Sequence, residues 1–258
     1  ALTSGDYNAA FGHNALTSST DASRNTAIGV DAMAACTTGT HNTAVGQAAM
    51  YLHTTGAGNT ALGQEALRTN TTGPQNTAIG LQTLYANTTG SSNTAVGYAA
   101  LNANTTASYN VAVGIHAMKV ATTAESNVAI GRQCLQGLTT GNYNTVIGHA
   151  AGANNAPMTT AHSNVILGAF CDPSGNDGAN QIVLGYDCTG VANNSITIGK
   201  GHASADRIYN YFTSNATWTR TSDERTKKDI ATNTDAGLAF VNDLRTVTYK
   251  WKAPSEYD

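Results

Sequence analysis

Charged and aromatic side chains are scarce in this sequence of 258 residues, of which 11% are charged and 7% aromatic. About a quarter of the residues in an average soluble domain are charged, so the composition is unlike that of an ordinary globular enzyme. The formal net charge is −3 and no basic stripe occurs, which argues against nucleic acid as a partner. No apolar run approaches the length of a membrane span, and we expect neither a signal peptide nor membrane insertion.

Cysteine and histidine are also few, with four and seven copies, and neither shows the spacing of metal ligands. We therefore expect no metal and no cofactor. Cys36 and Cys134 have no common place in the repeat described below. Cys171 and Cys188 are separated by one full period of that repeat, and this spacing predicts that they stack on each other. The pair could form a disulfide, but two buried thiols are the favoured interpretation.

What the sequence contains instead is one short motif, Asn-Thr-Ala-Ile/Val-Gly, which returns with a 17-residue period and without a slip from Asn8 to Asn144. Such a strict period indicates that each copy is one structural unit stacked on the next. A unit of this length is too short for a pair of helices and suits a small β-coil. The fold class predicted over 1–200 is therefore all-β, a β-solenoid or β-roll shaft.

Each unit carries two apolar positions and a polar corner. The first apolar position is Ile28 and its equivalents, the second is Met33 and its equivalents, and the corner reads Thr37-Thr38-Gly39. We interpret a unit as two short strands and two turns, with Ile/Val facing Leu/Met in a continuous core. Glycine would supply the backbone angles of the turns.

The residue before Ile28 is alanine in nearly every copy. Successive residues of a strand point to opposite faces, so an inward Ile28 predicts an outward Ala27. A column of outward alanines would suit close approach of another backbone, most simply an identical rod. The alternative is that alanine lines the inner wall of a narrow coil while threonine faces water.

The asparagine that opens each copy is predicted to form a structural ladder, because stacked asparagines can bond to one another and cap turns. The pattern loosens after Asn144, where further copies begin at Asn164, Gln181 and Ser195. The first of these intervals is longer than the period by a three-residue insertion, and the last is shorter than the period. The insertion predicts a bulging loop near 154–157. The irregular stretches 153–163 and 171–179 are the best candidates for surface recognition.

The stretch after Lys200 differs in chemistry, since it holds 8 of the 13 basic residues and both tryptophans. We expect a strand-rich connector at 201–221. Ser222, followed by acidic residues, is typical of a helix N-cap. Residues 236–245 have helical spacing and 247–251 alternate like a strand, which predicts a small α/β segment at 222–258.

Two motifs stand out in this segment, Ser-Asp-Glu-Arg-Thr-Lys-Lys-Asp-Ile at 222–230 and Leu-Arg-Thr-Val-Thr-Tyr-Lys-Trp-Lys at 244–252. Through these motifs the segment resembles the opening of the intramolecular chaperone domain of phage tail fibres, tailspikes and endosialidases. Thr226 stands where the family usually has leucine, and Asp229 where it usually has asparagine. The family's chaperones are longer than the segment after Asp223, so 222–258 is expected to be the beginning of one. The Asn-Thr-Ala-Ile/Val-Gly repeats also look like those of phage fibres and, more distantly, of trimeric autotransporter adhesins, and both are homotrimers.

In this family the chaperone aligns three chains and then removes itself by cutting a Ser-Asp bond. The resemblance implies that the scissile bond is Ser222–Asp223, with Ser222 as nucleophile and Lys227 as its activator. A hydroxyl needs a neighbouring base, and a lysine can serve only if burial or nearby cations depress its pKa. The alternative is that Ser222 caps a helix and Lys227 is solvated.

The leading functional hypothesis is a structural tail-fibre component of a phage or phage-like particle, extracellular on the virion. Its partners would be two further copies of itself, tail or baseplate proteins, and a host glycan or protein receptor. A bacterial surface adhesin is the alternative, and an ice-binding solenoid using columns such as Thr37 and Thr38 is a third. Catalysis on external substrates is not expected, because Asp31, Glu65 and Glu125 lie on separate coils and glycosidases need paired carboxylates.

Overall fold

The computed structural model describes residues 5–201, 206–212 and 219–220. Within these residues it contains strands and turns and no helix. The chain divides into two units, Ala1–Thr221 and Ser222–Asp258. The first unit is a β-solenoid whose strands recur at the period of the sequence motif. The predicted fold class, an all-β solenoid with a 17-residue period, is confirmed.

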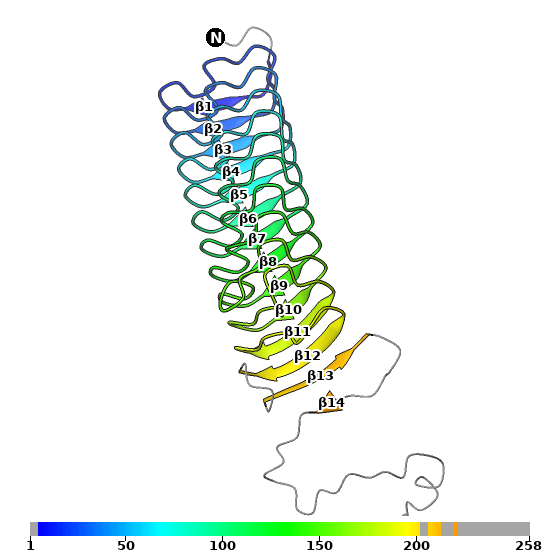
Figure 1. Cartoon of the computed structure of the whole chain (residues 1–258). Helices are drawn as coiled ribbons and strands as arrows, with labels where there is room; N and C mark the ends of the chain where they lie inside the picture. Colours follow the sequence, from blue (N-terminus) through cyan, green and yellow to red (C-terminus); the bar gives the residue numbers. More distant parts are fainter. Residues whose placement is uncertain (1–4, 202–205, 213–218, 221–258) are drawn as a thin grey trace, which may run out of the picture. The chain divides into compact units, whose positions relative to one another are not determined.

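Twelve strands, β1 to β12, lie side by side in one parallel sheet, each paired with the next along the chain (Figure 1). They are β1 (Ala9–Phe11), β2 (Thr26–Ile28), β3 (Thr43–Val45), β4 (Thr60–Leu62), β5 (Thr77–Ile79), β6 (Thr94–Val96), β7 (Val111–Val113), β8 (Val128–Ile130), β9 (Thr145–Ile147), β10 (Val165–Leu167), β11 (Gln181–Tyr186) and β12 (Ser195–Lys200). Equivalent residues of neighbouring strands are paired in register, for example Ala27 with Ala44. Two antiparallel strands, β13 (Arg207–Tyr211) and β14 (Thr219–Arg220), extend the sheet. At about 4.8 Å per strand, β1 to β12 extend over roughly 53 Å.

Each coil from β1 to β10 forms one strand, so the predicted second strand per unit is wrong. The second apolar residue lies in a turn with left-handed backbone, where φ is 50° at Met33 and 52° at Leu67. Regular strands have negative φ, which excludes these residues from one. Hydrogen bonds between coils still hold the turn, since the Met33 amide donates to the Ala49 carbonyl at 3.0 Å.

Alanine, rather than isoleucine or valine, faces the core from the sheet. Ala27 and Ala78 are fully buried, whereas Ile28 is 41% exposed. The prediction of an outward alanine column is therefore wrong, and the alternative of an inner alanine wall is confirmed. The coil is narrow, and the long side chains of Met33, Leu67 and their equivalents are buried within it. We infer that they leave room only for a methyl group on the strand side.

At the end of the regular repeat, a larger residue on the strand again goes with a smaller residue opposite it. From β9 onward the central strand residue is larger, Val146 and then Ile166, and both are buried. In the coil of β9 the ninth residue, counted from the opening asparagine, is only Gly152. The predicted insertion near 154–157 is a loop after Gly152, and it places Met158 in the core. The buried carboxylate of Asp172 holds this loop by accepting the amides of Asn154 at 3.1 Å and Asn155 at 2.7 Å.

The asparagines that open the repeats form the predicted ladder. The side-chain oxygen of Asn59 accepts the backbone amide of Asn76 at 2.9 Å, and the Asn76 side chain donates to the Gly90 carbonyl at 2.8 Å. The bond from backbone amide to side-chain oxygen repeats from Asn8 to Asn164, and the backbone amide of Gln181 closes the series. Most of these asparagines also donate their side-chain amide to a carbonyl, so they satisfy backbone groups of two neighbouring coils.

A second ladder, which the sequence analysis did not identify, is formed by the twelfth residue of successive coils, counted from the opening asparagine. It runs through His53, Asn70, Asn87 and Asn104, with side-chain contacts of 3.2, 2.8 and 2.6 Å between neighbours. The other ring nitrogen of His53 lies 2.9 Å from the Gly56 carbonyl. Burial lowers the pKa of His53, because the charged imidazolium would lose its hydration.

His53 is expected to make the solenoid less stable in mild acid. The unfolded chain binds a proton at His53 below about pH 6.5, whereas the folded chain keeps the ring neutral to a lower pH. The unfolded state therefore gains protons first, and the free energy of unfolding falls as the pH drops below about 6.5. His53→Asn introduces the amide used elsewhere in this column and is expected to reduce that loss. Thermal unfolding of both proteins between about pH 7.5 and pH 5 measures it.

His13→Asn is the matched control, because His13 is exposed on the first coil. The control is expected to keep the pH dependence of the original chain. Equal pH dependence in the His53→Asn protein and the original chain would show that the buried imidazole has no such role.

Candidate functional site

The outer face of the parallel sheet is the most extended candidate site in the described part of the chain. Each three-residue strand from β2 to β10 buries its central residue and turns the other two outward, as the alternation of a strand requires. The outward residues are the second and fourth of the motif, for example Thr77 and Ile79. Because the coils pair in register, these residues form two straight columns along the sheet.

The fourth-residue column is apolar and substantially exposed. Six of its side chains have exposed fractions between 36 and 46%: Ile28, Leu62, Ile79, Ile130, Ile147 and Leu167. From β1 to β12, neither outward column contains a charged residue. A soluble single chain seldom exposes so long an apolar stripe, and such stripes mark surfaces that contact other molecules. We call these two columns from β1 to β12 the strand face.

The sequence analysis placed this apolar column inside the coil and therefore missed the strand face. One signal could have corrected it. Where the central strand residue enlarges to Val146, the ninth residue shrinks to Gly152, which indicates that these two positions share the core. The fourth residue remains large in every copy and shows no such compensation.

Some of the threonine hydroxyls proposed as an ice-binding array already form hydrogen bonds to backbone carbonyls. The first threonine of each corner donates its hydroxyl to the equivalent carbonyl of the next coil, as Thr54 does to Thr71 at 2.9 Å and Thr71 to Thr88 at 3.0 Å. A hydroxyl used in this way stabilises the stack. One of the two threonine columns is therefore explained by structure alone.

All four cysteines are free and buried, so the disulfide between Cys171 and Cys188 is not formed. The two residues do lie on adjacent coils, where the amide of Asp172 donates to the Cys188 carbonyl at 3.0 Å. Burial raises the pKa of the Cys188 thiol to about 11 and of Cys134 to about 12. Such thiols stay protonated at neutral pH and are poor nucleophiles.

The acidic side chains of the coils are engaged separately. Asp31 accepts the Asn14 amide at 3.0 Å, and Glu65 lies 3.7 Å from Arg68 and accepts Gln82 at 2.9 Å. No cluster of three or more metal-ligating side chains occurs within the described residues. That part of the chain also has no helix long and apolar enough to cross a membrane.

The predicted self-cleavage residues Ser222, Asp223 and Lys227 lie outside the described residues, as do the predicted helix and strand that follow them. Their roles remain predictions.

Comparison with protein families gives a match in this same segment. Residues 222–258 match the family described as chaperone of endosialidase. No curated protein and no solved structure matches the chain. The family match and the β-solenoid together fit a phage tail-fibre-like protein.

Proposed function

We propose that this chain is a structural component of the tail fibre of a phage or phage-like particle. Three copies form a rigid shaft through their strand faces, and the segment at 222–258 assists their folding. The shaft is extracellular on the virion, is attached to tail or baseplate proteins, and presents contacts to a host receptor.

The observation that carries this proposal is the strand face. The strand face presents an uncharged side chain every roughly 4.8 Å. A partner with side chains at the same spacing can contact each of them. An identical chain has that period over the whole length, whereas a globular partner would match only a few coils. Identical chains usually assemble with closed symmetry, and a trimer agrees with the chaperone match.

The match at 222–258 supports assisted folding followed by self-cleavage. In this mechanism the Ser222 hydroxyl oxygen attacks the carbonyl carbon of the Ser222–Asp223 bond, and Lys227, deprotonated by its surroundings, accepts the hydroxyl proton and passes it to the leaving Asp223 nitrogen. Water then hydrolyses the ester that this attack forms. Overall, one water is consumed, the Ser222–Asp223 peptide bond is broken, and a carboxyl group at Ser222 and an amine at Asp223 are formed. Loss of the folding aid would leave the shaft protected by a high unfolding barrier.

Mass spectrometry of the protein made from its complete gene tests both parts of the proposal. The denatured protein is expected to give a chain ending at Ser222, and the native protein is expected to give three times that mass. Ser222→Ala is expected to abolish the shortened chain and keep the threefold assembly.

Asp229→Asn, which restores the family's usual residue beside the motif, is the control that should still be cut. Native masses of single chains only would overturn the trimeric shaft. An uncut chain in a trimer would instead reduce Ser222 and Lys227 to structural residues.

A further inference from the structure

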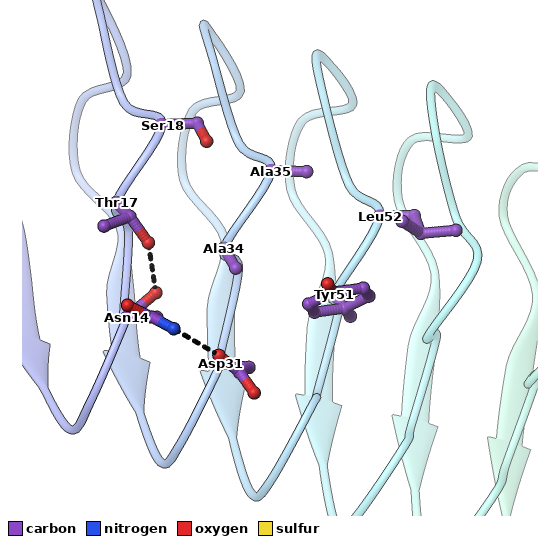
Figure 2. A pocket seen from close by; sticks show the side chains of 8 residues that line it. All are labelled: Asn14, Thr17, Ser18, Asp31, Ala34, Ala35, Tyr51 and Leu52. Carbon is purple, nitrogen blue, oxygen red and sulfur yellow. Dashed lines mark hydrogen bonds between the residues drawn. The ribbon is translucent and has the colours of Figure 1, made fainter.

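A hollow of about 330 Å³ opens on the surface of the first three coils, away from the strand face. Figure 2 shows the lining side chains on neighbouring coils, with Asn14 and Asp31 apart from the others. Asn14, Thr17 and Ser18 form one end, Ala34 and Ala35 form the floor, and Tyr51 and Leu52 form the other end, with Asp31 beside the floor. None of these residues belongs to the strand face.

The hollow exists because the repeat varies at its tenth and eleventh residues. The third coil carries Tyr51 and Leu52 there, whereas the second coil carries Ala34 and Ala35. The second coil thus has two methyl groups where the third coil has two large side chains. Its surface is therefore recessed between the first and third coils. The later coils restore large residues at the tenth position with Arg68 and Tyr85.

The ring of Tyr51, which forms one wall of the hollow, is held in place by contacts with neighbouring side chains. The Arg68 guanidinium lies over the Tyr51 ring at 5.3 Å and over the Tyr85 ring at 5.6 Å. The same guanidinium lies 3.7 Å from the Glu65 carboxylate. These contacts fix the aromatic ring before any ligand arrives, which lowers the entropic cost of binding against it.

The opposite end of the hollow is polar and ordered. The side-chain amide of Asn14 donates to Asp31 at 3.0 Å, and the Thr17 hydroxyl donates to the Asn14 carbonyl at 2.6 Å. A carboxylate has lone pairs for further donors, and the amide has one more N–H. An aromatic wall, an apolar floor and this polar end suit a ligand with C–H groups on its faces and hydroxyls on its rim.

We propose that this hollow binds one neutral sugar ring of a host surface glycan. The ring would lie on Ala34 against Tyr51, and its hydroxyls would donate to Asp31 and accept from Asn14. The negative charge of Asp31 disfavours sialic acid and other anionic sugars. The volume lies at the low end of ligand sites, which suits a single ring bound weakly and repeated in each copy of an assembly. The inference relies on the proposed function only for the source of the sugar.

Saturation-transfer NMR on the whole protein tests this proposal with the methyl glycosides of glucose, galactose, mannose and N-acetylglucosamine, and with the methyl glycoside of N-acetylneuraminic acid. At least one neutral glycoside is expected to receive saturation at millimolar concentration, and the sialoside none. Ala34→Tyr fills the hollow with the side chain that this column carries at Tyr51 and Tyr85. It is expected to abolish the transfer, and Tyr51→Ala to weaken binding about tenfold.

Tyr143→Ala is the matched control, because Tyr143 is an exposed tyrosine outside the hollow, and it should leave the signal unchanged. Thermal unfolding of each variant checks that the solenoid is intact. No transfer from any neutral glycoside, or equal transfer in the Ala34→Tyr protein, would overturn the inference. Native mass of the same samples separates this result from the proposed function, since a trimer without sugar binding contradicts only the hollow.

Discussion

Replacing both Leu62 and Ile79 by glutamate is expected to convert the proposed trimer into single chains. The two side chains are 46 and 36% exposed on adjacent strands, in the middle of the apolar column. Covering the exposed part of each contributes about 1 kcal/mol per chain. Burying a glutamate carboxylate without a partner costs several times as much, and three copies would meet at the same level. Native mass spectrometry and light scattering would measure the shift.

The matched control is Thr55→Glu with Thr72→Glu, which adds the same charge to two adjacent coils at the threonine corner. Both residues are exposed and lie outside the strand face. This control is expected to remain trimeric, and circular dichroism should show the same β-solenoid in both double variants. A trimer that persists in the Leu62→Glu, Ile79→Glu protein would move the assembly interface away from the strand face.

The second large effect is expected from Gly63→Ala. Gly63 follows β4 with φ of +134°, a conformation that residues with a side chain rarely adopt. An added methyl carbon would lie 2.6 Å from the Gly80 carbonyl oxygen of the next coil. The backbone of one coil would have to move, and this would disturb the hydrogen bonds between that coil and its neighbours. We expect a loss of roughly 3 kcal/mol or more, measured by chemical or thermal unfolding.

Gly58→Ala is the control for this substitution. Gly58 also has positive φ, at +71°, but the nearest atom to an added methyl carbon is Gln75 Cγ at 3.8 Å. Equivalent positions carry His41, with φ of 60°, and Gln75, with φ of 59°, so a side chain is accommodated there. The expected cost is about 1 kcal/mol. Equal losses in the two variants would show that backbone conformation alone, and not the close approach of coils, requires the glycine at Gly63.

Much of the fold could be predicted because it follows from repetition. A constant period requires stacked units, and an asparagine at the same place in every unit lies directly above and below its own copies, where it can bond to them. The ladder through Asn59 and Asn76 is therefore as predictable as the period itself. The ladder from His53 to Asn104 was missed because it covers only four coils and begins with a different residue type.

The direction of each side chain could not be predicted in the same way. Alternation along Thr77, Ala78 and Ile79 states only that the outer two share a face, and hydrophobicity favoured isoleucine for the core. Packing reverses this choice, because Leu84 and its equivalents are buried in the narrow coil and alanine alone fits beside them. Left-handed backbone at Leu84 likewise replaces the predicted second strand by a turn.

The sequence by itself determined the period, the β-coil, the asparagine ladder and the motif from Ser222 to Ile230 that points to the chaperone family, since each depends on residue order alone. Only the tertiary structure decided which apolar column faces outward and where two alanines leave a hollow beside Tyr51. Both depend on the space left between side chains from different parts of a coil or from neighbouring coils, and a linear sequence does not contain that space.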